Sequence, residues 1–470
     1  MYFATVLLLA CAIHCVYSAV TPVALLEAEW QRYVTRVQRE LTPLQTLLRE
    51  FSANKETSPC DQGHQSTLSP ATPNVAFEDH LQRRVDGIEA AIQLNGLFIS
   101  TFADVMSLHR RLQQDLDDDV ANEEDTELFM NSPYWVPLED TPPLYWRSCQ
   151  GDGEEGEGGL GGGGYTSVDE LFAHLHRDYG RADDGESRHR AAVVEAVRHI
   201  YSLHDQRDGG GVGHLQHAMW RRGSILVLGS GTGGLVADLR ADLLRGVLPN
   251  DEIAITATEC SLLFAAAAAA ILSLPVVDPQ ATSFGTLVPW VSNFGGAIEG
   301  DATDHLHRTT LHSPARIQRH DHPVVGGGGQ GTAAVRVQVI VADALSPRGN
   351  VAAAAEAQQA AVVVTYYFID AATSSSSSRY PRGILSVLDR IAQLCTPGGY
   401  WVHVGPLHYH RADTYPKLSV KDIELYMTQV HKFRRIGDVV VLPQEDYSRP
   451  NTTSLFVNAH RAVRLVMQRQ

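Results

Sequence analysis

The stretch Ser-Ile-Leu-Val-Leu-Gly-Ser-Gly-Thr-Gly-Gly (224–234) passes from a short apolar run directly into a turn that contains four glycines. An apolar run of this length that ends at glycine is typical of a buried strand. The glycines permit a tight backbone path and allow a ligand to approach the start of the following helix closely. A strand, a glycine-rich turn and a helix in this order predict the first crossover of an α/β sheet.

The chain after this turn alternates between strand-like and helix-like segments. We expect strands at 253–257, 335–342, 361–368, 400–404, 439–442 and 455–457, and helices at 262–274, 381–394 and 420–430. Strands that alternate with helices favour a mostly parallel sheet covered by helices on both faces. The predicted fold class is therefore α/β, with a doubly wound, Rossmann-like sheet.

The chain before the turn has a different character. Apolar residues recur at helical spacing over 21–51 and 77–112, and a further helical segment covers 168–203. Between them lie an acidic segment and a tract (151–164) in which nine of fourteen residues are glycine, typical of a flexible linker. We predict four regions: an apolar amino-terminal segment (1–20), a helical region (21–112), an acidic and glycine-rich linker (113–165) and the α/β domain (166–470).

The charge and cysteine content exclude several classes of function. The formal net charge is −16, but twelve of the carboxylates lie in 115–127 and 152–157, and solvated acidic loops explain them. No basic stripe is present, so we expect no nucleic-acid partner. The six cysteines lack metal-ligand or CxxC spacing, and no metal site is predicted.

The amino terminus leaves the compartment open. Residues 1–18 are mostly apolar and end in small residues, but they lack a basic start and are short for a membrane span. Secretion, an amino-terminal anchor and an incorrect start to the sequence remain alternatives. We expect a cytoplasmic protein, with the nucleus as a second compartment, or a protein of the secretory pathway if residues 1–18 act as a signal peptide. We expect no stable membrane partner. A homodimer is possible and is left open.

Two acidic residues at expected strand ends indicate the cofactor. Glu259 ends the strand after the glycine turn, where a carboxylate can accept hydrogen bonds from ribose hydroxyls. Such a turn serves NAD, FAD and S-adenosylmethionine alike. Asp343 ends the next strand and can accept from an adenine amino group, which favours S-adenosylmethionine, although a helix-cap aspartate has the same position.

Polar residues also follow two later strands. Val362 opens the run Val-Val-Val-Thr-Tyr-Tyr-Phe-Ile-Asp, which ends at Asp370, and the strand from Tyr400 leads to His410. Ligands in open α/β sheets lie beyond the carboxyl ends of strands. We therefore expect Asp370 and His410 beside a small polar substrate, against the alternatives of a helix-cap aspartate and a packed structural histidine.

Four motifs together resemble those of the carnosine N-methyltransferases, which depend on S-adenosylmethionine. Phe368-Ile369-Asp370 resembles the family's Phe-Ile-Asp-Thr-Ala signature. The run Pro-Gly-Gly-Tyr-Trp-Val-His-Val-Gly-Pro-Leu-His-Tyr-His (397–410) resembles its Pro-Gly-Gly-x-Trp-Ile-Asn-x-Gly-Pro-Leu-x-Tyr-His. Thr-Glu-Cys-Ser (258–261) is similar to its Asn-Glu-aromatic-Ser, and His-Leu-His-Arg-Asp-Tyr (174–179) is similar to its Gln-x-x-Arg-Asp-Trp.

The resemblance implies methyl transfer from S-adenosylmethionine to an imidazole nitrogen of carnosine, which gives anserine, or to a related histidine dipeptide. It implies catalytic and substrate-binding roles for Asp370 and His410, and Asn451 stands where the family has a substrate-contacting tyrosine. The implied cofactor contacts are His174, Arg177, Gly229, Gly231, Glu259, Asp343, Ala344 and Val362.

Three alternatives remain at this point. The acceptor could be another imidazole compound or a protein histidine. The glycine turn would also suit an NAD-linked oxidoreductase, although no hydride-transfer residue set follows it. A non-catalytic, cofactor-binding interaction protein would fit the low-complexity insertions at 313–332 and 374–378.

Overall fold

The structure is a computed structural model, and its described residues fall into fourteen segments. They are 22–57, 73–118, 134–136, 167–180, 187–205, 224–246, 252–277, 282–289, 308–314, 334–341, 360–372, 383–408, 417–446 and 459–470.

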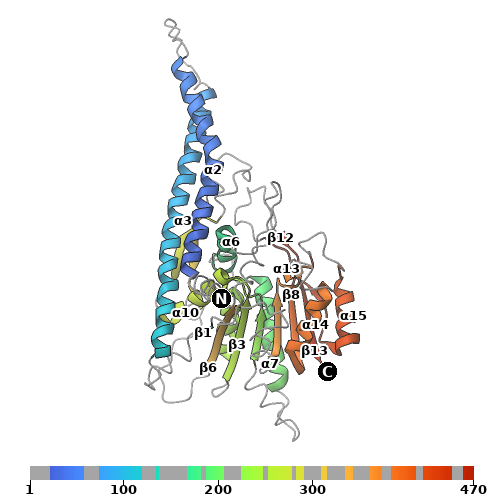
Figure 1. The fold of residues 1–470 in the computed structure, drawn as a ribbon. Helices are drawn as coiled ribbons and strands as arrows, with labels where there is room; N and C mark the ends of the chain where they lie inside the picture. Colours follow the sequence, from blue (N-terminus) through green and yellow to red (C-terminus); the bar gives the residue numbers. More distant parts are fainter. Residues whose placement is uncertain are drawn as a thin grey trace, which may run out of the picture.

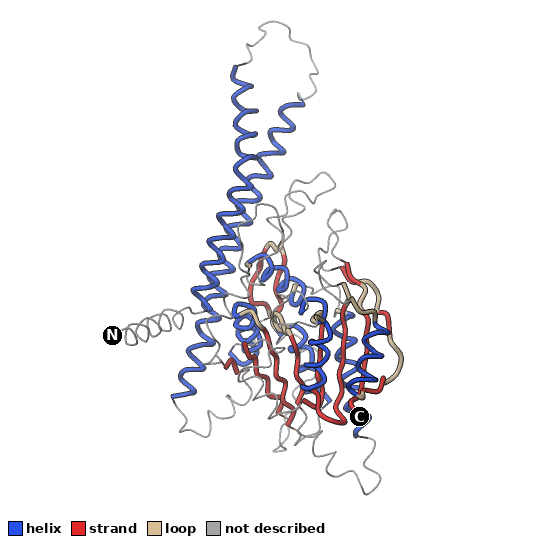
Figure 2. The backbone as a smooth tube through the Cα atoms, turned by 45° about the vertical axis from the view of Figure 1, so that its right-hand side comes forward, coloured by secondary structure: helices blue, strands red, loops and turns tan. Residues whose placement is uncertain are grey.

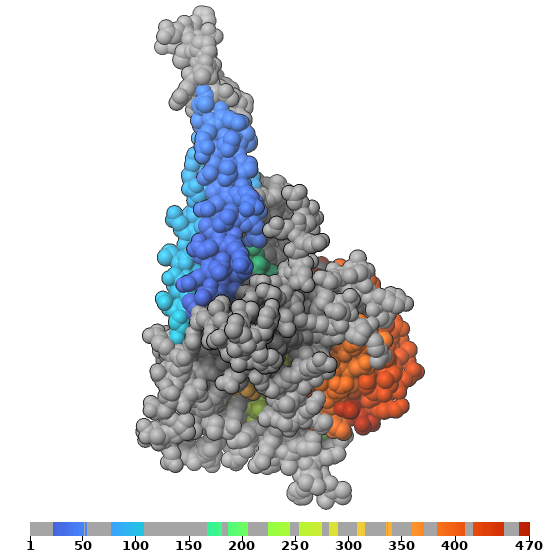
Figure 3. All heavy atoms as spheres, viewed as in Figure 1, coloured from blue at the N-terminus to red at the C-terminus, as the bar shows by residue number. Residues whose placement is uncertain are grey.

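Two long helices, α2 (Pro22–Thr57) and α3 (Pro73–Asp118), pack side by side and project from the body of the molecule (Figures 1 and 3). The spacing of their buried residues matches the helical periodicity of the sequence, and the predicted helices at 21–51 and 77–112 are confirmed. Asn95 joins α3 to the body, because its side chain donates to Val288 O (2.9 Å) and accepts from Val288 N (2.7 Å).

The central sheet is confirmed as mostly parallel. Its strands run in the order β1-β6-β3-β2-β7-β8-β13-β10, with β9 paired to β13. The pairs from β1 to β8 are all parallel, whereas β13 is antiparallel to β8, β9 and β10. The strands are β1 (Tyr134–Val136), β2 (Ser224–Leu228), β3 (Glu252–Glu259), β6 (Ala334–Val341), β7 (Ala360–Tyr366), β8 (Cys395–Gly405), β9 (Phe433–Arg435), β10 (Val440–Val441) and β13 (Val463–Arg469).

Helices cover both faces of this sheet (Figure 2). The helices α7 (Arg188–Asp205), α9 (Gly234–Gly246) and α10 (Leu262–Val277) pack on one face, and α14 (Ile384–Leu394) and α15 (Val420–His431) pack on the other. Alternation along β7 explains the two cores: Val364 faces the first set of helices and Val363 the second. The doubly wound architecture is thus present.

A separate core joins the long helices to the body. It contains side chains from α2, α3 and α10 together with α6 (Val168–Tyr179), in which Leu171, Phe172 and Leu175 are fully buried. Phe172 makes edge contacts with Tyr33 of α2 and Phe98 of α3, at centroid distances of 5.7 and 6.0 Å. The hairpin of β4 (Ser283–Leu287) and β5 (Thr309–His312) borders this core.

Several details differ from the expectation. The segment 168–203 forms two helices, α6 and α7, because α6 ends at the C-cap residue Gly180. The turn 396–399 is a bulge inside β8, since Cys395 pairs with Ala360 and Tyr400 already pairs with Val362. The strand β13 was not predicted, and the strand expected at 455–457 lies outside the described residues.

The remaining short elements are α13 (Ile369–Ala372), β11 (Glu445–Asp446) and β12 (Ala459–His460), the last two paired antiparallel. None of the described helices combines the length and the hydrophobicity of a membrane span. The segment 1–20 and most of 113–165 lie outside the described residues, so the division into four regions stays a prediction.

Candidate active site

The glycine turn after β2 lies where the strand order reverses. From β2 the chain adds β3 and β6 on one side, and it later adds β7 and β8 on the other. A crevice outside the carboxyl ends of the strands forms at such a switch point, and ligands bind there. The predicted cofactor turn therefore occupies the expected place in the fold.

The backbone of this turn requires glycine. Gly229, Gly231 and Gly233 have φ angles of +66°, +57° and +87°. A Cβ atom on Gly229 would also lie 2.5 Å from Phe368 Cδ2, so the turn and the segment after β7 approach each other closely. Any side chain at Gly229 would add both backbone strain and a clash.

Glu259 is bound to this turn from the end of β3. Its Oε2 accepts from Gly231 N at 2.9 Å, and its Oε1 accepts from Ser261 N at 2.9 Å. Burial raises the pKa of this carboxyl, and the backbone donors of Ser261 and Gly231 oppose the rise. The structure thus brings the predicted residues Gly229, Gly231 and Glu259 together.

Helix α6 places two more predicted residues over the turn. His174 Nδ1 and Arg177 lie 3.2 and 3.6 Å from the position of a Cβ on Gly231, and Arg177 lies 3.3 Å from His174 Nδ1. Burial, aided by the neighbouring Arg177 charge, lowers the pKa of His174 to about 3, so its imidazole is neutral. His174 also packs against Phe264 of α10, at a centroid distance of 4.8 Å.

Asp178 is a central residue of the site that the sequence interpretation did not select. Its carboxylate accepts from Arg177 Nε (2.8 Å), Thr232 Oγ1 (2.6 Å) and Gly234 N (3.4 Å). Burial alone would raise its pKa, but the guanidiniums of Arg177 and Arg190 hold it well below its usual range. Asp178 therefore connects helix α6 to the glycine turn and to the start of α9. Its place directly after Arg177 in the shared motif was the available signal.

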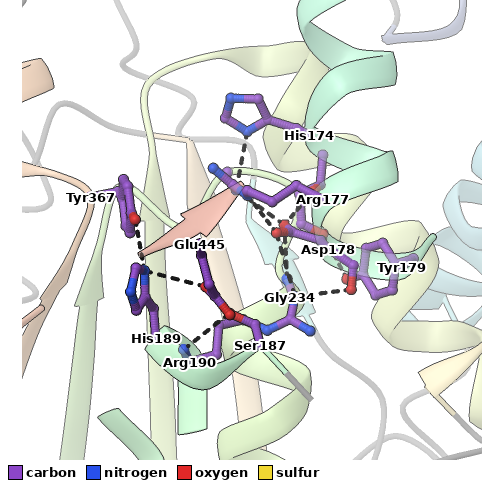
Figure 4. A network of polar contacts seen from close by, with 12 residues as sticks. His174, Arg177, Asp178, Tyr179, Ser187, His189, Arg190, Gly234, Tyr367 and Glu445 are labelled. Carbon is purple, nitrogen blue, oxygen red and sulfur yellow. Dashed lines mark hydrogen bonds and ion pairs between the residues drawn. The ribbon is translucent and has the colours of Figure 1, made fainter. Parts of the chain in front are cut away.

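This network continues to the other side of the site (Figure 4). Arg190 donates to Asp178 O (2.9 Å), and its backbone N–H donates to Ser187 Oγ (3.3 Å). Ser187 Oγ donates to Glu445 Oε2 (3.0 Å), and Glu445 lies 3.2 Å from His189 Nδ1. These last residues were also missed, because 189 and 445 meet only through the fold.

Asp370 is the second residue of α13 and is buried. Since β7 ends at Tyr366, the carboxylate follows the carboxyl end of the strand beside β2, as predicted. The structure does not bring Val362 to this group: it is fully buried within the sheet and pairs with Ile225, away from the strand ends. Asp343, Ala344, His410 and Asn451 lie outside the described residues.

A second set of hydrogen-bonded polar side chains lies within β7 and β8. Trp401 Nε1 donates to Thr365 Oγ1 (3.0 Å), and Thr365 Oγ1 lies 3.1 Å from His403 Nδ1. Burial lowers the pKa of His403 to about 4, so this imidazole is neutral. No cluster of three or more His, Cys, Asp or Glu side chains suited to a metal ion occurs among the described residues.

The strand order, the glycine turn at the switch point and the acid at the end of β3 define a class I S-adenosylmethionine-dependent methyltransferase. The family model described as carnosine N-methyltransferase matches residues 166–470. The chain belongs to this family, and it is an N-methyltransferase.

No curated protein matches the chain. Among solved structures, a class I methyltransferase assigned by similarity from Listeria monocytogenes has 11% identity and a TM-score of 0.31, covering 83% of this chain and 87% of its own. The DszA carbon methyltransferase has 15% identity and a TM-score of 0.31, covering 93% of each chain. The N-methyltransferase NodS from Bradyrhizobium japonicum has 8% identity and a TM-score of 0.22, covering 58% of this chain and 96% of its own.

Proposed function

We propose that this enzyme transfers a methyl group from S-adenosylmethionine to an imidazole nitrogen of carnosine, giving anserine, or of a closely related histidine dipeptide. The family match over 166–470 carries the proposal. The buried carboxyl of Asp370 at the end of β7 supports it, because an imidazole N–H needs an acceptor of this kind.

The residues around the glycine turn fit the adenosine and amino-acid parts of the cofactor. The glycines leave the backbone of the turn open to close approach, and Glu259 is held at the turn by backbone donors. In this proposal Glu259 accepts from the ribose hydroxyls, and Arg177 with His174 binds from α6. Asp343 and Ala344 are proposed to contact the adenine. The bound sulfonium supplies an activated methyl group.

Asp370 would orient the acceptor. A carboxylate that accepts one ring N–H fixes the imidazole tautomer, so the lone pair of the other nitrogen is available for attack. That nitrogen forms the new N–C bond while the electrons of the broken C–S bond remain on sulfur. Positioning of the two reactants supplies much of the rate enhancement. His410 and Asn451 are proposed to bind the rest of the dipeptide.

The acceptor can be tested with methyl-labelled S-adenosylmethionine and a panel of carnosine, free histidine, imidazole and a histidine-containing protein. Product masses should show one methyl group on carnosine. Methylation of the protein histidine instead of carnosine would overturn the proposed substrate, and preferential binding of NAD in calorimetry would overturn the reaction.

Variants of two aspartates test the site. The Asp370→Asn enzyme should lose about 100-fold or more in kcat/KM while it retains cofactor affinity, because an amide cannot supply the same charge to the imidazole. Asp389→Asn is the matched control: Asp389 lies on α14 and accepts from Tyr426 OH (2.6 Å), away from the strand ends. Full activity of Asp370→Asn would show that Asp370 is only a helix-terminal residue.

A further inference from the structure

A buried acid–histidine arrangement includes Tyr367, the residue that follows β7 and precedes Asp370 by three positions. We call it the Tyr367 cluster, and it consists of Tyr367, His189 and Glu445. Tyr367 OH lies 2.8 Å from His189 Nδ1, and the same Nδ1 lies 3.2 Å from Glu445 Oε2 (Figure 4). His189 is fully buried, whereas Tyr367 is partly exposed. The cluster joins β11, the start of α7 and the end of β7.

The hydrogen bonds of His189 determine its tautomer. Its Nε2 lies 2.7 Å from Pro443 O, which is a carbonyl and can only accept. Nε2 must therefore carry a hydrogen. In the neutral ring, Nδ1 is then an acceptor, and the Tyr367 hydroxyl donates to it.

The surroundings also satisfy the protonated ring. Glu445 is held in place by Arg188 N (2.6 Å) and Ser187 Oγ (3.0 Å), both donating to its carboxylate. If Nδ1 takes up a proton, its N–H faces Glu445 Oε2, while Nε2–H still faces Pro443 O. A buried histidine that served packing alone would need partners for one state only, whereas His189 has them for both.

Tyr367 is fixed at the strand ends. It has a positive φ of 52°, and its N–H donates to Val404 O at 2.9 Å. It lies three residues before Asp370, and a Cβ on Gly405 would be 3.1 Å from its backbone nitrogen. Positive φ is costly for a bulky residue, and such strain gathers at functional sites.

Further imidazole rings extend from Tyr367 toward the end of β8. The ring of His460 on β12 lies 6.1 Å from that of Tyr367, and the ring of His408 lies 6.2 Å from that of His460. The titratable and charged groups around His189 are thus Glu445 from β11, His460 beyond Tyr367, and Arg188 and Arg190 on its own helix.

We propose that the Tyr367 cluster accepts the proton that the acceptor imidazole loses on methylation; this inference rests on the proposed function. Methylation of a neutral imidazole gives a methylimidazolium, and its N–H proton must leave to yield the neutral product. Because the proposed function places this N–H on the Asp370 carboxylate, the proton passes by way of Asp370 to the oxygen of Tyr367, as the hydroxyl proton of Tyr367 moves to His189 Nδ1. The resulting imidazolium is balanced by Glu445 and releases the proton to water before the next turnover.

Two variants separate this role from packing. Tyr367→Phe retains the ring and removes the hydroxyl, and His189→Gln retains hydrogen-bonding capacity without taking up a proton. General acid–base groups contribute about 10²–10⁴-fold, so each variant should lose about 100-fold in kcat with KM nearly unchanged. The double variant should lose little more than either single one, because both act on one proton.

The chain offers a matched control in a second tyrosine–histidine pair. Tyr400 OH lies 3.2 Å from His204 Nε2, near the other end of α7. His204 lies fifteen positions after His189 on the same helix, about 22 Å at 1.5 Å per residue. Tyr400→Phe should therefore retain kcat.

The kcat values of the variants at saturating acceptor complete the test. If Tyr367→Phe matches Tyr400→Phe in kcat, the proton role is overturned although carnosine methylation stands. If the wild type methylates another imidazole of the panel, the variants are compared on that acceptor; if it methylates none, the proposed function and this inference fail together.

Discussion

Replacement of Asp178 by asparagine should destabilise the methyltransferase domain and weaken cofactor binding together. The amide keeps the shape of the side chain but removes the charge that faces Arg177 and Arg190. Breaking a buried ion pair costs about 3–5 kcal/mol because the remaining charge stays buried. Arg190 retains Asp238 at 2.7 Å, so we expect the lower end, about 3 kcal/mol.

Thermal unfolding and cofactor calorimetry measure the two effects. At about 2–4 °C per kcal/mol, the melting temperature of Asp178→Asn should fall by roughly 10 °C. Affinity for S-adenosylmethionine should fall about 10-fold, because Asp178 also accepts from Thr232 and Gly234 in the turn. Asp242→Asn is the control: its partner Arg198 is largely exposed, and exposed pairs contribute less than about 1 kcal/mol.

The pH dependence of stability gives an independent test of Asp178. The folded-state pKa of Asp178 lies below its ordinary value, so its contribution to stability is present above the ordinary carboxyl pKa of 3.8 and is lost as the pH falls further. The asparagine variant should lose less stability than the wild type below that pH. A variant that melts within about 2 °C of the wild type with unchanged cofactor affinity would refute the role assigned to Asp178.

Three further predictions concern the turn, its acid and the thiols. Gly229→Ala should weaken cofactor binding at least about 10-fold, as measured by calorimetry. The positive φ costs alanine about 1–2 kcal/mol, and its Cβ would clash with Phe368. Gly398→Ala is the control and should bind the cofactor normally, because Gly398 has a similar φ but no neighbour within 4 Å. Because burial raises the pKa of Glu259, cofactor affinity should fall on acidification at a higher pH than an ordinary glutamate would give, and Glu259→Gln should abolish this dependence. Burial raises the pKa of the Cys395 thiol to about 12, so alkylation at neutral pH should leave it unmodified in the native enzyme, whereas the exposed Cys260 should react. Peptide mapping of the alkylated enzyme measures both, and labelling of the two thiols at equal rates would contradict this expectation.

The sheet and the turn could be predicted because their signals are local. The apolar run 224–228 and the glycines after it specify a strand and a turn through the residues themselves. The antiparallel strand β13 was missed, although Val463, Leu465 and Met467 alternate with less buried residues. Its assignment depends on pairing with β8, which the local pattern does not contain.

The candidate site could be predicted only in part, for a similar reason. Arg177, Glu259 and Asp370 were selected because each stands in a recognisable local motif, within α6, at the end of β3 and in α13 after β7. The contact of His189 with Glu445 joins residues 256 positions apart and arises from tertiary packing alone. Val362 was selected by resemblance, yet its position in β7 places it in the sheet interior.

The helical hairpin has a consequence for how this enzyme can be divided. Sequence similarity to the family begins at residue 166, but Phe172 packs against Tyr33 and Phe98 of the two long helices. Each buried aromatic or leucine side chain of α6 is stabilised by about 1.5–3 kcal/mol through such burial. A fragment cut at the similarity boundary would expose this apolar surface on the helix that carries His174 and Arg177. The two long helices therefore complete the core of the helix that carries His174 and Arg177, and we expect a stable catalytic fragment to include them.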